Sequence, residues 1–454
     1  MSTTTIPAAT CEVADRVEPS PQVTKLCMFQ PEQSLDAQIS RTAAYVKDPK
    51  DYLTSILGAD ALESRSSLLC IPSTPIDKDV YGRGEAKGQF ETHVAKLLGK
   101  QHGLFFQTGV QAQLAACKIH CQRAKQSITA WHISSHLESA EEAAYKELYS
   151  LSRQLLGRNK DALPSVAEIK EVLALPMEQR PAVIVVEIPN RTLGCETYEF
   201  TELEEISAAC KEADVKFHMD GARIWEIEPY YVATAGKTFA DLGKLFDSVY
   251  VSFYKGLGGA TGAMLLHNDE DFVNEARVWQ RRAGGNAYSM SYYWADCQRG
   301  FNETIGTFGE KREKMLGVAN GIIEATKDFK AEDGTPIVRF RPQPPNCCQT
   351  HTIFHGFTGK QLEAARDKVQ DAMGVRVFER LRPKISVDEM MAKERTEKSS
   401  SYLATEKKEV NEAEAEDKTH FMEWSVMSIT EKIETKVFVD AYVSLCKALL
   451  ENKI

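Results

Sequence analysis

The chain has 454 residues, of which 43% are hydrophobic and 26% are charged, and its formal net charge at pH 7 is −10. This size and composition are typical of a globular protein with two or three domains. The acidic balance argues against a nucleic-acid-binding protein, which would normally present a basic surface. No apolar run approaches the roughly 20 residues needed to cross a bilayer. From the charge and from the absence of such a run, we expect neither a nucleic acid nor a membrane as partner.

Residues 1–74 are predicted to form an N-terminal tail and arm, and beyond them short apolar runs alternate with helical patterns. The predicted strands are 103–108, 127–132, 182–188, 215–221, 248–253 and 262–267. The predicted helices between them are 110–122, 137–156, 201–213 and 269–281. This alternation is typical of crossover units in a mostly parallel sheet with helices on both faces. We therefore predict a large α/β domain over residues 75–305, with ligands bound at the carboxyl ends of its strands.

Residues 306–454 show a different pattern, in which helices accompany a few strands such as "HTIFHGF" and "FMEWSVMSI". This pattern predicts a smaller α+β domain. Within it, residues 393–420 contain almost no apolar side chains. Because such a segment cannot bury enough apolar surface to order itself, we expect a solvated, mobile insertion.

The 11 cysteines are scattered along the chain, and the N-terminus has neither the basic start nor the apolar stretch of a secretory signal. In a large acidic chain of this kind, free thiols in a reducing compartment are expected. We therefore predict a cytoplasmic protein without a disulfide framework.

Lys255 lies at the end of the apolar run in "SVYVSFYKGLGGATGAMLLH", directly before a series of glycines. A buried amine is costly unless it is used, paired or covalently attached. A lysine in a tight site can have a lowered pKa and can form a Schiff base with a carbonyl group. Gly256, Gly258 and Gly259 would allow the backbone to approach a ligand closely. The alternative is a lysine that extends from the tip of a strand into solvent.

Two further predicted strand ends carry candidate binding residues. In "FFQTGVQAQLAA", Thr108, Gly109 and Val110 open a helix whose first amides could bind phosphate, although an ordinary strand-to-helix turn is the alternative. In "VKFHMDGARIWE", Asp220 ends a strand, where it could pair with a cationic ring nitrogen or simply cap a helix. A phosphate-binding turn, an acid and a strand-end lysine together fit pyridoxal 5′-phosphate.

A metal site is not predicted from the histidines. His132 and His136 have an H-x-x-x-H spacing, but no HExxH sequence and no third ligand accompany them. Residues 82–88, "GRGEAKG", lack the spacing of a dinucleotide or Walker loop and predict a turn into a helix.

Four segments resemble the threonine aldolase and β-eliminating lyase family of pyridoxal-phosphate enzymes: "DVYGRGEAKGQFETHVAKLLGK", "TGVQAQLAACKIHC", "HMDGARIWE" and "FYKGLGGATGAML". The similarity covers roughly residues 79–300 in the same order. It implies fold type I, the fold of aspartate aminotransferase, with a mostly parallel sheet and pyridoxal 5′-phosphate as cofactor. It also implies a homodimer or homotetramer with sites at the subunit interface.

The resemblance further implies roles for individual residues. Lys255 would form the Schiff base, Asp220 would pair with the pyridine nitrogen, and Arg223 would contact the phenolic oxygen. His136 would stack on the ring and could transfer protons, because histidine titrates near neutrality. Tyr81 would lie near the substrate. The expected cofactor-binding residues are Lys255, Asp220, Arg223, His136, Thr108, Gly109 and Val110.

The sequence departs from the family pattern near its C-terminus. The family places an arginine on a late strand, where it binds the substrate carboxylate as a bidentate pair. The matching strand here carries Glu423, which would repel a carboxylate. Arg191, which follows a predicted strand end, could bind the carboxylate instead, and Arg376, Arg380 and Arg382 are further candidates. The alternative is that the substrate is not a plain α-amino acid such as threonine.

We therefore predict a pyridoxal-phosphate lyase that cleaves the Cα–Cβ bond of a β-hydroxy-α-amino acid and gives glycine and an aldehyde. The substrate amine would displace Lys255, and His136 or a held water would take the proton of the β-hydroxyl group. Two alternatives stay open. One is β-elimination on another amino acid, and the other is a non-catalytic scaffold that binds the cofactor.

Overall fold

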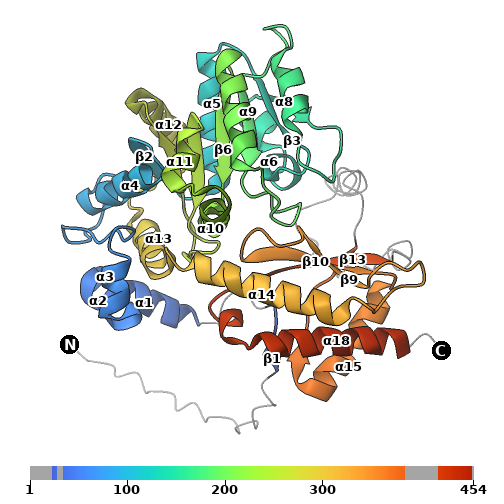
Figure 1. The fold of residues 1–454 in the computed structure, drawn as a ribbon. Helices are drawn as coiled ribbons and strands as arrows, with labels where there is room; N and C mark the ends of the chain where they lie inside the picture. The colour runs from blue at the N-terminus through green and yellow to red at the C-terminus, as the bar shows by residue number, and fades with distance from the viewer. Residues whose placement is uncertain (1–22, 28–33, 384–417, 452–454) are drawn as a thin grey trace, which may run out of the picture.

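The computed structural model describes residues 23–27, 34–383 and 418–451. Its largest sheet has seven strands and lies in the upper part of the molecule as drawn in Figure 1. The spatial order of the strands is β2-β8-β7-β6-β5-β3-β4. All neighbouring pairs from β7 through β4 are parallel, whereas β8 is antiparallel to both of its neighbours. The strands are β2 (His102–Phe106), β3 (Ile128–His132), β4 (Ser152–Leu156), β5 (Val183–Glu187), β6 (Lys216–Gly221), β7 (Ser248–Ser252) and β8 (Ala263–His267).

Helices cover both faces of this sheet, so its central strands are apolar on both sides. In β5, Val183 and Val185 pack on the face that α5 covers, whereas Ile184 and Val186 pack on the face covered by α4, α8 and α9. The helices around the sheet are α4 (Glu85–Leu97), α5 (Gly109–Arg123), α8 (Val166–Leu173), α9 (Phe200–Glu212), α10 (Ile224–Ala235), α11 (Phe239–Lys244), α12 (Glu270–Arg282) and α13 (Ser291–Thr304). The mostly parallel α/β architecture predicted from the sequence is confirmed.

The C-terminal region contains a smaller antiparallel sheet in the order β12-β13-β10-β9 (Figure 1). Its strands are β9 (Val338–Arg341), β10 (Gln349–His355), β12 (Arg382–Pro383) and β13 (Thr419–Ser425). In the described part of this region the helices are α14 (Phe308–Thr326), α15 (Gly359–Met373), the 3₁₀ turn η1 (Thr430–Lys432) and α18 (Thr435–Glu451). This arrangement confirms the predicted α+β character of the region.

The N-terminal segment contributes helices and one short strand. The helices are α1 (Leu35–Lys47), α2 (Pro49–Leu57) and α3 (Ala59–Ser64). Strand β1 (Thr24–Lys25) pairs in parallel with β11 (Val375–Arg376), so the beginning of the described chain lies against its C-terminal region. Residues 1–22 of the predicted tail lie outside the described residues.

The predicted helix over residues 137–156 is wrong. The segment contains α6 (His136–Ser139), α7 (Ala144–Glu147) and the edge strand β4. Glu142, Ala143 and Ser150 have positive φ angles, which a continuous α-helix does not allow. The last residues of the segment instead pair with β3, so a tertiary contact overrides the local helical pattern.

The structure describes only part of the predicted mobile insertion, residues 393–420. Most of the predicted insertion, residues 393–417, lies outside the described chain, but Thr419 and His420 belong to β13 and pair with β10. In the described ranges, no helix is long and apolar enough to cross a membrane, and all ten cysteines are free.

Three histidines lie where α5 packs on the large sheet: His120 of α5, His218 of β6 and His267 of β8, of which the first two are buried. The Ser248 hydroxyl group is 2.8 Å from His120 Nε2 and 2.7 Å from His218 Nδ1. The His267 ring centroid is 6.1 Å from that of His120. Burial lowers the pKa of His218 to about 3 and that of His267 to about 4. These imidazoles are therefore neutral in the folded protein at pH 7.

We expect the free energy of unfolding to fall as the pH drops below about 6.5, where unfolded histidines bind protons but these folded ones do not. Each such group costs roughly 1.4 kcal/mol per pH unit until its folded pKa is reached. His218→Gln should remove one proton from the difference between the unfolded and folded states. Urea unfolding at pH 7 and pH 5 measures this change, and an unaltered pH slope in the variant would contradict it.

Candidate active site

The carboxyl ends of three strands bring the predicted site residues to one edge of the large sheet. Glu187 of β5 is in register with Asp220 of β6, which is in register with Tyr250 of β7. Because aligned neighbours point to the same face, all three lie on the face covered by α5. Lys255 follows the end of β7 and interacts electrostatically with Asp220 and Glu187. The structure therefore gathers groups that are up to 68 residues apart in sequence, as the numbers 187 and 255 show.

The amine of Lys255 has a lowered pKa. Burial is the main cause, and the nearby positive charge of Arg223 adds to it, while Asp220, Glu187 and Glu226 oppose it. A lowered pKa increases the fraction of neutral amine, which is the nucleophilic form.

The turn after Lys255 is tightly held. The Gly256 amide donates to Glu226 Oε1 at 3.0 Å, and a Cβ atom at Gly256 would lie 2.6 Å from that oxygen. Gly258 has a φ of 71°, which favours glycine. The glycines are therefore needed for the close packing that fixes the backbone next to Lys255.

Asp220 is only 1% exposed, and its Oδ1 atom accepts a hydrogen bond from the Ala222 amide at 3.1 Å. Glu187, which the sequence reasoning did not single out, lies beside it. Burial and the charge of Asp220 raise the pKa of Glu187 to about 7. Its Oε2 atom is buried without a hydrogen-bond partner among the described residues. Such an unsatisfied oxygen needs an explanation, and an absent ligand provides one.

His136 begins α6 and is paired with a second acid that the sequence reasoning missed. Its Nδ1 atom is 2.9 Å from Glu141 Oε1, and this hydrogen bond raises the pKa of His136. Glu141 is buried, and burial raises its pKa in turn. The acid fixes the ring orientation and leaves the other ring nitrogen, Nε2, for proton transfer. The only sequence signal was an acid five residues after the histidine.

Helix α5 begins at the predicted phosphate-binding turn. Thr108 caps the helix by accepting a hydrogen bond from the Gln111 amide at 3.3 Å. A Cβ atom at Gly109 would lie 2.0 Å from the Tyr250 hydroxyl oxygen, so only glycine fits beside this tyrosine. Tyr250 in turn interacts with the hydroxyl group of Tyr254. Val110 is the second residue of the helix, whose first amides lie at the positive end of the helix dipole.

The expected carboxylate-binding arginine is already paired. Arg191 donates from Nε and Nη2 to the two carboxylate oxygens of Glu423, at 2.7 Å and 2.5 Å. Burial acts to raise the pKa of Glu423, but the hydrogen bonds and charge of Arg191 outweigh it and lower this pKa. Arg223 donates from Nε to Gln349 Oε1 at 2.6 Å. Glu423 is thus bound by a cation and does not face the site as an isolated negative charge.

Other predicted residues have hydrogen-bond or ring contacts outside the group of Lys255, Asp220 and Glu187. Tyr81 is 48% exposed, and its ring packs edge-on against Tyr288 with a centroid distance of 5.4 Å. Arg376, one of the alternative carboxylate ligands, is bound to Gln370 and Glu379 instead. His132 belongs to β3 and is bonded to Ser134, and no group that could hold a metal ion is found in the described chain.

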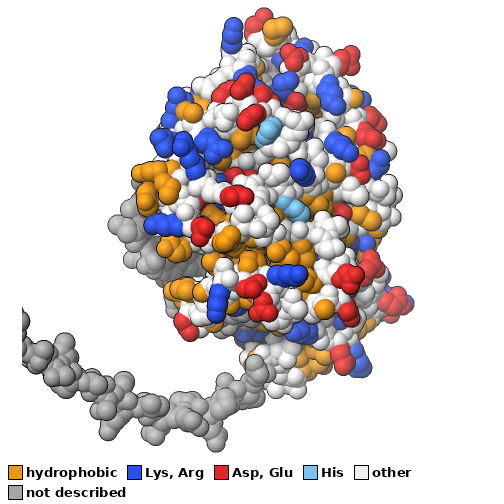
Figure 2. Space-filling view, turned by 90° about the vertical axis from the view of Figure 1, so that its left-hand side faces the viewer, with side chains coloured by type: hydrophobic (Ala, Val, Ile, Leu, Met, Phe, Trp, Pro, Cys, Tyr) orange, Lys and Arg blue, Asp and Glu red, His pale blue; other side chains and the backbone are white. Residues whose placement is uncertain are grey.

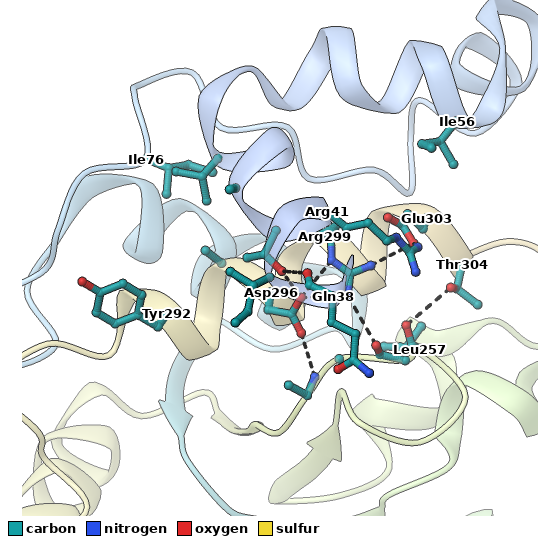
Figure 3. Close-up of a pocket in the computed structure, with 18 of the residues that line it drawn as sticks. Gln38, Arg41, Ile56, Ile76, Leu257, Tyr292, Asp296, Arg299, Glu303 and Thr304 are labelled. Atoms are coloured by element: carbon teal, nitrogen blue, oxygen red, sulfur yellow. Dashed lines mark hydrogen bonds and ion pairs between the residues drawn. The ribbon is translucent and has the colours of Figure 1, made fainter. Parts of the chain in front are cut away.

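A cavity of about 1080 Å³ lies beside the glycine turn that follows Lys255, and residues of α1 and α13 line it. Lys255 does not line it, although the residues from Gly256 to Ala260 do. Figure 3 shows Asp296 and Arg299 of α13 pointing toward this turn, and Asp296 accepts from the Ala260 amide at 2.7 Å. Asp296 therefore stabilises the turn from the side of this cavity. The candidate active site is the group of residues around Lys255.

The residues around Lys255 fit pyridoxal 5′-phosphate in their chemistry. They supply an amine for the aldehyde, a buried carboxylate for the ring nitrogen and helix-start amides for the phosphate. The unpartnered oxygens of Glu187 and Glu141 are two buried acceptors in the same cluster whose hydrogen bonds are incomplete within the described residues.

Comparison with known proteins agrees with this chemistry. The beta-eliminating lyase family matches residues 73–422. The low specificity L-threonine aldolase of Escherichia coli O157:H7 is 26% identical over 283 residues, which cover 60% of this chain and 79% of that protein. Alanine racemase TOXG of Cochliobolus carbonum is 26% identical over 272 residues, which cover 59% of this chain and 66% of that protein.

A solved structure is similar over nearly the whole chain. It is a candidate L-allo-threonine aldolase from Listeria monocytogenes, with a TM-score of 0.71 and 29% identity. The similarity covers 94% of this chain and 97% of that one. The match in both sequence and fold shows that this chain belongs to the threonine aldolase and beta-eliminating lyase family, whose members have fold type I and use pyridoxal 5′-phosphate.

Proposed function

We propose that the protein cleaves the Cα–Cβ bond of a β-hydroxy-α-amino acid and releases glycine and an aldehyde. The observation that carries this proposal is the hydrogen-bonded pair of His136 and Glu141 in the same cluster as Lys255 and Asp220. Carbon–carbon cleavage requires a base for the β-hydroxyl proton, and an imidazole oriented by a carboxylate is suited to that role. The L-threonine aldolase among its relatives supports the same chemistry.

Four parts of the chain would hold the cofactor: Lys255 at the aldehyde, Asp220 at the ring nitrogen, Arg223 at the phenolic oxygen, and the start of α5 with Thr108, Gly109 and Val110 at the phosphate. When bound, pyridoxal phosphate supplies an aldehyde for the substrate amine and a cationic ring that withdraws electrons from the α-carbon. The carboxylate of Asp220 would favour the protonated form of the ring nitrogen, and the burial of Asp220 would strengthen this interaction.

His136 Nε2 would accept the β-hydroxyl proton while the bond between Cα and Cβ breaks. The carboxylate of Glu141 stabilises the imidazolium ion that forms. The same ring would return a proton once the aldehyde has left, so no other buried base is required. Arg191 would bind the substrate carboxylate, and Tyr81 would lie near the substrate side chain.

An assay of the holoenzyme with L-threonine, L-allo-threonine and an amino acid that carries a β-leaving group tests the proposal. Glycine and acetaldehyde in equal amounts are expected from at least one threonine isomer. Pyruvate and ammonia from the third substrate alone would favour β-elimination, the reaction after which the family is named. Bound cofactor without turnover on any of the three would favour a scaffold protein.

We further propose that two copies associate through the face formed by the N-terminal helices. Figure 2 shows hydrophobic side chains gathered in the lower half of this side of the molecule. Leu35 is 71% exposed, Ile39 60% and Tyr292 77%, and all three line the cavity beside the glycine turn. Large exposed apolar patches usually mark interaction surfaces.

Light scattering should therefore give a mass of two chains or four, and Leu35→Glu with Ile39→Glu should shift it toward one chain. An unaltered mass in this double variant would contradict the choice of this face. We also propose that the large domain spans residues 75–305, that the small domain begins at residue 306, and that the protein is cytoplasmic.

A further inference from the structure

The late strand β13 contributes an acid where the family resemblance predicts a cation, and this acid connects two arginines from the large sheet. Glu423 binds Arg191 through both of its oxygens. It also accepts a hydrogen bond from Gln349 Nε2, while Gln349 Oε1 accepts from Arg223 Nε. The distance from Arg223 Nη2 to Glu423 Oε1 is 3.8 Å. One carboxylate and one amide therefore link a residue of the β5 loop to a residue at the end of β6.

The geometry leaves part of the Arg191 guanidinium group for a ligand. Glu423 occupies the side of the guanidinium that carries Nε and Nη2, and in the described residues Nη1 has no hydrogen-bond partner. The Arg191 side chain is 36% exposed, whereas that of Glu423 is 15% exposed. The acid is therefore the less exposed member of the pair, and the cation is the more accessible one. A planar guanidinium fixed along one edge presents its remaining N–H groups in a defined direction.

The two arginines offset the repulsion that Glu423 was expected to exert on a substrate carboxylate. Two guanidinium groups and one carboxylate leave one net positive charge in this group of four residues, since Gln349 is neutral. The ionised form of Glu423 is favoured, because Arg191 and Arg223 lower its pKa. An incoming carboxylate therefore meets a net positive group, in spite of the glutamate at the late-strand position.

We infer that Glu423, held by Gln349, is a positioning residue that fixes Arg191 so that its free edge binds the α-carboxylate of an amino-acid substrate. This inference rests on the proposed function, because it places the carboxylate of that substrate. In this chain the carboxylate-binding cation is Arg191, which follows β5, and Glu423 of β13 holds it in place. Under this inference, the substrates are limited to amines with a free α-carboxylate. Amines without that group should not be bound more tightly because of the Arg191–Glu423 pair.

Equilibrium binding to the holoenzyme tests the role of Glu423 independently of turnover. The probes are glycine and 2-aminoethanol, which replaces the carboxylate with a hydroxymethyl group, and binding is followed through the absorbance of the bound cofactor. Glu423→Ala should weaken glycine binding by about 10- to 100-fold, in line with the loss of charge-assisted hydrogen bonds, and should change 2-aminoethanol binding by less than about threefold. Glu423→Gln, which keeps the shape and one acceptor, should lie between the wild type and Glu423→Ala.

A charge exchange gives a second readout. Arg191→Glu alone should abolish the preference for glycine, and Arg191→Glu combined with Glu423→Arg should restore part of it, because the pair then has its cation on the late strand. The control is Glu379→Gln, which removes the acid from the Arg376–Glu379 pair away from the cluster and should leave both affinities unchanged. If Glu423→Ala or Glu423→Gln fails to fold, the charge-exchange pair carries the test.

Three outcomes would overturn the inference. Tighter glycine binding in Glu423→Gln would show that the acid repels the carboxylate. Equal losses for glycine and 2-aminoethanol would show a general structural role, and no loss for either would show no role. Failure of the proposed function looks different, because the wild type would then bind glycine with the expected preference but release no aldehyde from any β-hydroxy amino acid.

Discussion

Replacement of Lys255 by alanine is expected to lower turnover by at least about 10³-fold, because under the proposed function the variant loses the amine that would attach the cofactor. The loss should appear in kcat, since Asp220, Arg223 and the start of α5 would still bind the cofactor. The fold should be retained, because the neighbouring glycine turn is held by Glu226 and Asp296 and not by the lysine amine. Rates of aldehyde release from the wild type and the variant measure the effect.

Two controls make this result specific. Lys255→Arg keeps the positive charge but offers no comparable nucleophile, so it should be as inactive as Lys255→Ala. Borohydride treatment of the wild type should leave a cofactor label on the peptide that contains Lys255 and on no peptide of the alanine variant. A labelled and active alanine variant would show that another lysine carries the cofactor, and the assignment of the site would then be wrong.

Replacement of Asp220 by asparagine is expected to lower kcat by about 10²-fold, the usual cost of losing one preorganised electrostatic contact in a catalytic site. Asparagine keeps an oxygen that can accept from the Ala222 amide, so packing at this position should be preserved. It removes the negative charge that, under the proposed function, would keep the ring nitrogen cationic. The rate and the absorbance of the bound cofactor should therefore change together, whereas a purely structural defect would lower the melting temperature instead.

The matched control is Glu187→Gln, which removes the neighbouring carboxylate from the same face of the sheet. If Asp220 acts through a specific contact with the ring, Glu187→Gln should cost less than the Asp220 variant. Burial and the charge of Asp220 raise the pKa of Glu187, which also reduces the cost of losing its negative charge. Equal losses in the two variants would show that the site needs overall negative charge and not one placed acid.

The sequence by itself determined the α/β class and the positions of the chemically distinctive strand ends. Apolar runs such as 182–188 and 248–253 predict strands because hydrophobic patterning and strand propensity are local properties. The turn after Lys255 is local in the same way, since it needs glycine at a positive φ and at close contacts. Family membership then confirmed pyridoxal 5′-phosphate, the cofactor expected from the sequence.

The tertiary structure alone decided which charges meet. Arg191 and Glu423 are 232 residues apart, and only the packing of β13 beside the end of β5 brings them together. The register between β5 and β6 places Glu187 beside Asp220, and the turn after α6 places Glu141 on His136. Residues 152–156 became a strand because β3 offered an edge to pair with. Local sequence encodes propensity, whereas strand pairing and the burial of charge depend on the whole chain, so the partners of Arg191 and Asp220 could be known only from the fold.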